Sequence, residues 1–284
     1  MTKLRILAAM AVGALTATLG GFGAHAQTAS PVEARNVVLV HGAWADGSSW
    51  AEVIPLLQAA GLRVTAVQNP LTSLADSVAA TRRALALQDG PTVLVAHSWG
   101  GTVISEAGID PKVSALVYVA ARAPDAGEDF VALSGKFPTG PVRAGIQQHD
   151  GFTTISEEPF LRSFANGVVH TKAEVLYAVQ KPTAAALFGE RTTAAAWHSK
   201  PSWYAVSKLD QTINPDLERF LAKRMNATTV ELEAGHLSLV SHPREIADVI
   251  LAAAGRARDS WRVVEFGATG PSRRASDRPT CDPC

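Results

Sequence analysis

This sequence has few cysteines, no net charge and only one long apolar run. Its cysteines, Cys281 and Cys284, both lie at the carboxyl end of the 284 residues, so a disulfide framework cannot hold the fold. The 26 Lys and Arg residues equal the 26 Asp and Glu residues in number, so no net field attracts nucleic acid or an anionic membrane. We therefore expect neither as a partner.

The long apolar run lies at the amino terminus. Two basic residues, Lys3 and Arg5, precede an apolar stretch over residues 6–19, and a small-x-small cleavage site follows at residues 24–26. This arrangement is typical of a secretory signal peptide. We predict that residues 1–26 are a leader and that the protein is exported, to the periplasm or the medium, without stable membrane association after cleavage. The alternative is a membrane anchor, although three glycines interrupt the run and no stop-transfer charges follow.

The carboxyl-terminal segment is rich in Gly, Pro, Ser and Arg, as in GATGPSRRASDRPTCDPC. Such a composition buries little apolar surface, and we predict that residues 256–284 are disordered. The C-x-x-C spacing of Cys281 and Cys284 resembles half of a redox or metal site. Because it lies in this tail, we assign no chemistry to it.

Between these ends, apolar runs alternate with helical patterns, and we predict one domain over residues 27–255. The expected strands are residues 36–40, 63–68, 91–97, 112–120, 202–207 and 228–232. Strands that alternate with helices predict an α/β fold, with a mostly parallel sheet covered by helices on both faces. Right-handed crossovers bring the carboxyl ends of the strands to one rim, where such sheets carry their functional loops.

One segment, from about residue 124 to about residue 200, departs from the alternation. It contains no strong strand signal, whereas AEVLYAVQ and PTAAALF favour short helices. A segment of this length is too long for a plain loop, so we predict a helical cap over the rim. The small and apolar residues of 184–188 favour an apolar pocket for the acyl or alcohol part of a substrate. A purely structural layer is the alternative.

A single serine, Ser98, lies in VAHSWGG, where a predicted strand ends and a predicted helix begins. A serine hydroxyl is a weak nucleophile and needs a base that a third group orients. Asp210 and His236 each follow another predicted strand, and the order Ser, Asp, His is that of hydrolases with a serine elbow. The alternative for Ser98 is a simple helix N-cap.

The residues around Ser98 suit a strained turn. Ala96 and Gly100 are the small residues that the turn requires two positions before and after the serine, and Gly101 allows the helix to pack tightly on the strand. Trp99 N–H is one expected oxyanion donor, at the positive end of the following helix.

The loop after the first strand, VLVHGAW, is expected to supply the second donor, Ala43 N–H. A simpler interpretation is that Gly42 only permits a tight turn while His41 bonds to backbone. The two interpretations are compatible.

The stretches HGAWADGSSW, AHSWGG, DQTINP and GHLSLVSHP resemble the α/β-hydrolase family, especially its small capped branch of methyl-ester esterases and hydroxynitrile lyases. The resemblance covers about residues 36–254, and Ala96 departs from the usual glycine. It implies hydrolysis of carboxylic esters or lactones through an acyl-enzyme, with a small-molecule ester as substrate and no cofactor or metal. The implied roles are nucleophile for Ser98, base for His236, orienting acid for Asp210, and oxyanion donors for Ala43 and Trp99.

Several other polar residues have alternative roles. Asp125 follows the strand predicted at residues 112–120, where some α/β-hydrolases carry their acid, and is the rival partner of His236. His97 is expected to be structural rather than a second base. His242 is expected to start the last helix, because Pro243 suits its first turn. The histidines of the cap, His149, His170 and His198, show no metal-ligand spacing.

Trp44 and Leu237 are expected to contact the substrate.

The two alternative functions are a hydroxynitrile lyase and a non-catalytic binding protein. Leu237 occupies the position where similar hydroxynitrile lyases have a lysine, and this difference disfavours a lyase. A non-catalytic small-molecule binding protein of the same fold often lacks a member of the Ser-His-Asp set, whereas this sequence has all three.

Overall fold

Six parallel strands form the main sheet of the computed structural model, which describes residues 33–256. The strands are β1 (Asn36–Val40), β2 (Arg63–Val67), β3 (Thr92–His97), β4 (Val113–Val119), β8 (Ser202–Ser207) and β9 (Thr228–Leu232). Their order is β2-β1-β3-β4-β8-β9, and each neighbouring pair is parallel. All six strands predicted from the sequence are therefore confirmed, within two residues at each end.

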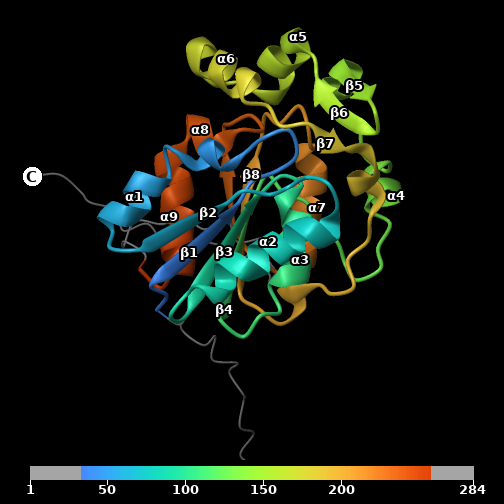
Figure 1. Cartoon of the computed structure of the whole chain (residues 1–284). Coiled ribbons are helices and arrows are strands. Elements are labelled where there is room, and N and C mark those ends of the chain that lie inside the picture. The colour runs from blue at the N-terminus through green and yellow to red at the C-terminus, as the bar shows by residue number, and fades with distance from the viewer. Residues whose placement is uncertain (1–32, 257–284) are drawn as a thin grey trace, which may run out of the picture. The chain divides into compact units, whose positions relative to one another are not determined.

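Helices cover both faces of this sheet (Figure 1). The helices α1 (Ile54–Ala59) and α9 (Pro243–Ala253) pack on one face, whereas α2 (Leu74–Ala86), α3 (Gly100–Ala107) and α7 (Pro215–Arg224) pack on the other. The strands β1, β3 and β8 are buried at every residue, and the edge strand β2 is partly exposed along most of its length. Burial on both faces explains why the central strands are nearly continuous apolar runs.

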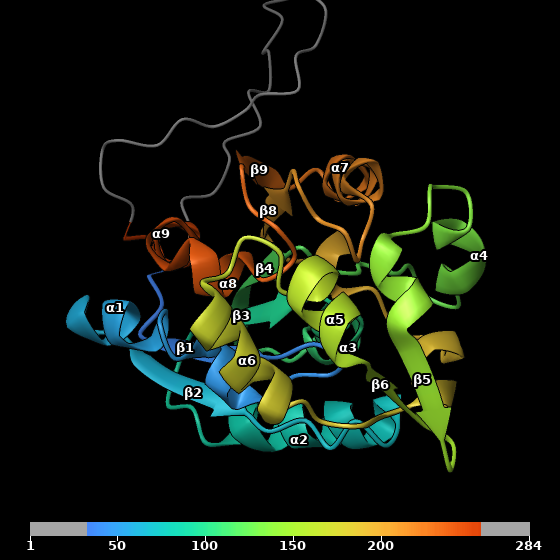
Figure 2. The same ribbon diagram turned by 90° about the horizontal axis from the view of Figure 1, so that it is seen from above.

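Most of the segment between β4 and β8 lies over the carboxyl ends of the strands, as Figure 1 and Figure 2 show, and its last residues return past α3 to the amino end of β4. Its helices are α4 (Phe130–Ser134), α5 (Glu157–Pro159) and α6 (His170–Ala178). The short helical turns are η2 (Pro141–Gly145), η3 (Phe160–Phe164), η4 (Ala185–Gly189) and η5 (Ala196–His198), while η1 (Gly47–Trp50) follows β1 and α8 (Ser238–Ser241) precedes α9. We refer to residues 124–200 as the cap.

The cap also contains a small antiparallel sheet that the sequence analysis did not predict. Its strands β5 (Ile146–His149), β6 (Phe152–Ile155) and β7 (Thr183–Ala184) pair in the order β5-β6-β7. Asp150 and Gly151 join the first two strands with positive φ angles of 48° and 80°. Asp-Gly is a common sequence for this kind of hairpin turn, and that dipeptide was the signal for the missed strands.

No helix in the described range 33–256 is long and apolar enough to cross a membrane. The predicted leader (residues 1–26) and almost all of the predicted tail, with Cys281 and Cys284, lie outside the described residues.

Candidate active site

Ser98 occupies a sharp turn between β3 and α3. Its φ angle of 55° lies in the left-handed region, which is strained for a residue with a Cβ atom. The N-cap of α3 is Trp99 and not Ser98, and the Ser98 hydroxyl bonds to a histidine instead. The simple N-cap alternative for Ser98 is therefore wrong.

Three glycines give the turn the space that it needs. A Cβ atom on Gly42 would lie 2.6 Å from Ser98 Cβ, and one on Gly100 would lie 2.8 Å from the His41 carbonyl oxygen. A Cβ atom on Gly101 would overlap the Arg122 carbonyl oxygen at the end of β4. Gly42 therefore does more than permit a turn, because a larger residue there would collide with Ser98. Gly100 must be small because the backbone that follows β1 passes close to it.

Substituting Gly101 by alanine is expected to lower the free energy of unfolding by about 1–3 kcal/mol, because the Arg122 carbonyl group must move to make room for the new Cβ atom. Gly90 offers a matched control, since a Cβ atom there meets nothing within 4 Å. Gly90→Ala should leave stability unchanged or raise it slightly. Chemical denaturation of both variants measures the difference, and equal midpoints would contradict the packing argument.

Ser98, His236 and Asp210 form a continuous chain of hydrogen bonds. His236 Nε2 lies 2.9 Å from Ser98 Oγ, and His236 Nδ1 lies 2.6 Å from Asp210 Oδ2. An ionised carboxylate only accepts hydrogen bonds, so Nδ1 carries the proton and Nε2 is free to accept from the serine hydroxyl. The other carboxylate oxygen of Asp210 accepts from the N–H groups of Thr212 and Ile213, which holds the acid in place.

His236 is fully buried, and its loop after β9 is held from two sides. His97 Nε2–H donates to the His236 carbonyl oxygen at 3.0 Å, and the Phe164 ring of the cap lies 5.1 Å from the imidazole centroid. Burial lowers the pKa of His97 well below the usual range, so its ring is neutral. The structure therefore gives His97 a structural contact, and α9 begins at Pro243 after His242, as predicted.

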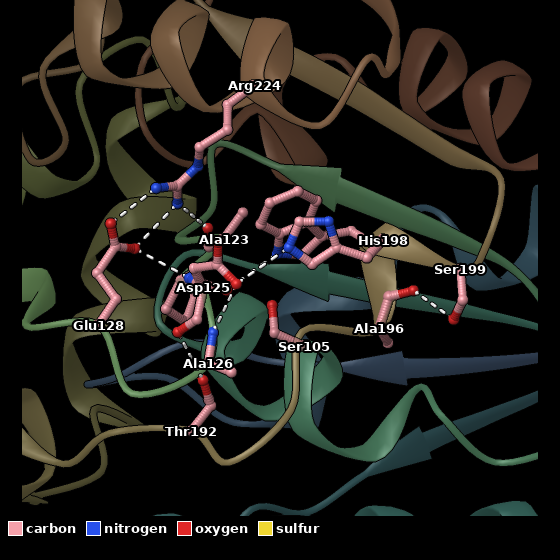
Figure 3. Close-up of polar contacts among 12 residues, drawn as sticks. Ser105, Ala123, Asp125, Ala126, Glu128, Thr192, Ala196, His198, Ser199 and Arg224 are labelled. Carbon is pink, nitrogen blue, oxygen red and sulfur yellow. Dashed lines mark hydrogen bonds and ion pairs between the residues drawn. The ribbon is translucent and has the colours of Figure 1, made fainter.

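Asp125, the rival partner for His236, lies in a different cluster (Figure 3). Its Oδ1 is 3.0 Å from Nε2 of the exposed His198, and Thr192 Oγ donates to its carbonyl oxygen. Beside it, Arg224 makes a paired contact with Glu128 at 2.7 and 3.0 Å. The alternative that Asp125 orients His236 is therefore wrong in this structure, because its carboxylate bonds to His198 while His236 Nδ1 bonds to Asp210.

The two expected oxyanion donors lie on either side of Ser98. Ala43, in the loop after β1, and Trp99, at the amino end of α3, both line the same cavity as the serine. Within residues 33–256, neither N–H group donates to a protein acceptor, which leaves both free for a substrate oxygen. Neutral His41 braces the loop, because its Nε2 accepts from Asn69 N–H and its Nδ1–H donates to the Gly42 carbonyl. Burial lowers the pKa of His41 to about 4.

The cap also holds the oxyanion loop. Trp44 has a positive φ of 55°, and its backbone N–H donates to Thr183 Oγ at 2.9 Å. Its indole N–H donates to Thr153 Oγ at 3.0 Å. Two threonines of the cap sheet therefore fix the residue beside Ala43, a link that no local sequence signal indicated.

A cavity of about 650 Å³ opens beside Ser98. Trp44 lines it, as predicted. Its wall comes from the rim of the main sheet, the cap and the start of α7, through residues that include Phe130, Val131, Val142, Ile146, Phe188, Ile213 and Leu217. Leu237, expected to contact substrate, does not line this cavity. It is 2 % exposed and lines a small separate hollow beneath the cap, so that expectation is not met.

A buried carboxyl group, Glu218, lies behind Asp210 and was missed in the sequence. It is on α7, it is fully buried, and its Oε2 accepts from Ser207 N–H at 2.9 Å. Burial and then the adjacent Asp210 carboxylate raise its pKa well above the usual range. A glutamate on an amphipathic helix normally indicates the solvated face, so nothing in the sequence singled it out.

Glu218→Gln is expected to flatten the dependence of stability on pH. The pKa of Glu218 is higher in the folded than in the unfolded protein. The contribution of Glu218 to the free energy of unfolding is therefore complete below its unfolded pKa, near 4.5, and is lost as the pH rises through its folded pKa. Wild type should lose stability steadily as the pH rises across that window, whereas glutamine does not titrate. Denaturation between pH 5 and 8 measures the slope.

Glu231→Gln is the control for this prediction. The hydrogen-bonded ion pair with Arg219 lowers the pKa of Glu231. Replacing the Glu231 carboxylate should therefore leave the dependence of stability on pH above pH 5 as in wild type. The same slope in wild type and Glu218→Gln would show that Glu218 is not protonated on folding.

Comparisons with known proteins show the family of this chain. Residues 37–249 match the alpha/beta hydrolase family. The chain is 28 % identical over 246 residues to a carbendazim hydrolyzing esterase of Nocardioides sp., a match that covers 76 % of this chain and 98 % of that protein. It is 26 % identical over 255 residues to methylesterase 8 of Arabidopsis thaliana, covering 78 % of this chain and 90 % of that protein.

A similar solved structure is that of a polyneuridine aldehyde esterase. It superposes with a TM-score of 0.67 at 20 % identity, and the match covers 76 % of this chain and 98 % of that one. At this identity the likeness shows a shared fold.

Proposed function

We propose, on the premise that this chain belongs to the alpha/beta hydrolase family, that it hydrolyses carboxylic esters with Ser98 as nucleophile, His236 as base and Asp210 as orienting acid. The observation that carries the proposal is the Ser98–His236–Asp210 chain, with distances of 2.9 and 2.6 Å. Several relatives are named esterases or methylesterases, which supports esters as the substrate class. Lactones are cyclic esters and are open to the same attack.

The acylation step follows from the positions of these groups. Ser98 Oγ attacks the ester carbonyl carbon while His236 Nε2 takes the hydroxyl proton, and Asp210 stabilises the imidazolium. The carbonyl oxygen becomes an oxyanion that the N–H groups of Ala43 and Trp99 stabilise. Collapse of the intermediate breaks the bond to the alkoxy oxygen, and His236 returns the proton to the leaving alcohol.

Deacylation repeats these steps with water in place of the serine. His236 takes a proton from water, the resulting hydroxide attacks the acyl carbon, and Ser98 leaves with the proton returned by His236. The products are the carboxylic acid and the free enzyme.

Labelling of the full chain with a fluorophosphonate tests the proposal. We expect a covalent adduct on Ser98, located by peptide mass spectrometry, together with hydrolysis of a panel of p-nitrophenyl esters of rising chain length and of lactones. Heat-denatured protein is the control for non-specific labelling. Absence of both adduct and hydrolysis would instead support a binding protein, and cyanide release from cyanohydrins would support a lyase.

A further inference from the structure

A basic residue, Arg122, lies directly beside the nucleophile. It follows β4, and its backbone N–H donates to the Ser98 carbonyl oxygen at 3.0 Å. Arg122 lines the cavity into which Ser98 opens, and its guanidinium group lies over the rings of Phe130 and Phe188, which line the same cavity. The backbone contact just beyond the paired strands β3 and β4 therefore holds Arg122 next to the serine turn.

This guanidinium group has no acidic partner among residues 33–256. Its carbon lies 4.9 Å from the Phe130 ring centroid and 5.2 Å from that of Phe188, and one nitrogen donates to the Phe188 carbonyl oxygen at 3.4 Å. No carboxylate among residues 33–256 lies within ion-pair distance of it. Burial lowers the pKa of Arg122 to about 10, so it stays charged at neutral pH with most of its five donors unused.

Other partly buried arginines of this chain are paired. Arg224 contacts both carboxylate oxygens of Glu128, and Arg219 contacts both oxygens of Glu231. A desolvated cation is costly unless it is paired and hydrogen-bonded. The exception at the cavity therefore indicates that the partner of Arg122 comes from outside the protein.

The lining of the cavity has the matching charge. It contains two arginines, Arg122 and Arg143, and no aspartate or glutamate among the described residues. The rest of the lining is mostly apolar or neutral. A substrate with an anionic group would be attracted by both cations and would meet no opposing carboxylate in this wall.

We propose that the substrate carries, in addition to its ester, an ionised carboxylate that pairs with the Arg122 guanidinium inside the cavity. The inference rests on the proposed function, because it assigns a substrate class to the same site. A planar guanidinium binds a carboxylate through two parallel hydrogen bonds. The rings of Phe130 and Phe188 beside Arg122 provide apolar surface for the carbon chain that links the carboxylate to the ester.

Paired substrates that differ only in charge test this proposal on the full chain. In the first pair, monomethyl adipate is compared with its neutral amide, so the carboxylate is on the acyl side. In the second, the acetate ester of 6-hydroxyhexanoic acid is compared with its amide, so the carboxylate is on the alcohol side. In at least one pair, wild type should show a kcat/KM about 10- to 100-fold higher for the acid.

Arg122→Gln should remove this preference, mainly through a higher KM for the acid, so that the acid and its neutral amide partner are then hydrolysed at the ester with similar kcat/KM. The control is Arg162→Gln, which removes an exposed arginine paired with Glu158 in the cap and should keep the preference. A preference that is absent in both pairs, or an equal loss on acid and amide in Arg122→Gln, would overturn the proposal.

The fluorophosphonate adduct separates this failure from failure of the proposed function. Hydrolysis of the neutral esters with an adduct on Ser98, but no preference for acids, would overturn only the carboxylate proposal. Absence of both hydrolysis and adduct would overturn both.

Discussion

Ser98→Ala is expected to lower kcat on the best ester by about 10⁴- to 10⁶-fold. The variant keeps a Cβ atom at the same φ of 55°, so the strain of the turn and its packing against Gly42 are unchanged. It lacks the oxygen that attacks the carbonyl and accepts the acyl group. The remaining rate would come from the oxyanion donors and substrate binding, which persist without the nucleophile.

A second buried serine provides the control for this prediction. Ser105 lies on α3, and its hydroxyl contacts the Gly101 carbonyl oxygen and the Tyr118 hydroxyl. Ser105→Ala should keep activity within a few-fold of wild type. Steady-state rates with a p-nitrophenyl ester, and thermal unfolding of both variants, make the comparison. Substantial activity in Ser98→Ala would remove the serine from the mechanism.

Asp210→Asn is expected to lower kcat by about 10⁴-fold while the fold is retained. The Asn side-chain amide would donate to His236 Nδ1, and the imidazole proton would then move to Nε2. The nitrogen that faces Ser98 Oγ at 2.9 Å would become a donor and could no longer take the hydroxyl proton. The loss should therefore appear in kcat with little change in KM.

Asp125→Asn is the matched control, because it makes the same substitution at the rival acid. Asp125 bonds to the exposed His198 and lies apart from the Ser98–His236–Asp210 chain. Near wild-type activity is expected, measured with the same ester under the same conditions. If Asp125→Asn lost activity and Asp210→Asn kept it, the acid would be assigned to the wrong strand end.

The parallel sheet could be predicted because burial on both faces leaves a direct trace in the sequence. Runs such as NVVLV at β1 and SWYAVS at β8 are buried throughout, and helical patterns separate them. The positions of Ser98, Asp210 and His236 just after predicted strands also follow from local pattern. The strand order then brings residues far apart in sequence to one rim.

The cap and the surroundings of the site were harder to predict. The strands β5 and β6 have four residues each, which is too short for a clear alternation. Glu218 resembles any polar residue of an amphipathic helix, and Arg122 is one basic residue in a loop. Glu218 has a raised pKa because it is buried beside Asp210, and Arg122 lines the cavity. Both positions depend on how elements far apart in the sequence pack together.

The sequence by itself determined the α/β architecture and indicated Ser98 and His236 as candidates for ester cleavage, because strand burial and the place of each residue just after a strand are local patterns. Only the tertiary structure decided that Asp210 rather than Asp125 meets His236, that Leu237 lies outside the cavity, and that Arg122 lines the cavity with no acidic partner in the described part of the chain. These are contacts between segments of distant sequence position, and their distances depend on how the cap and the helices pack on the sheet.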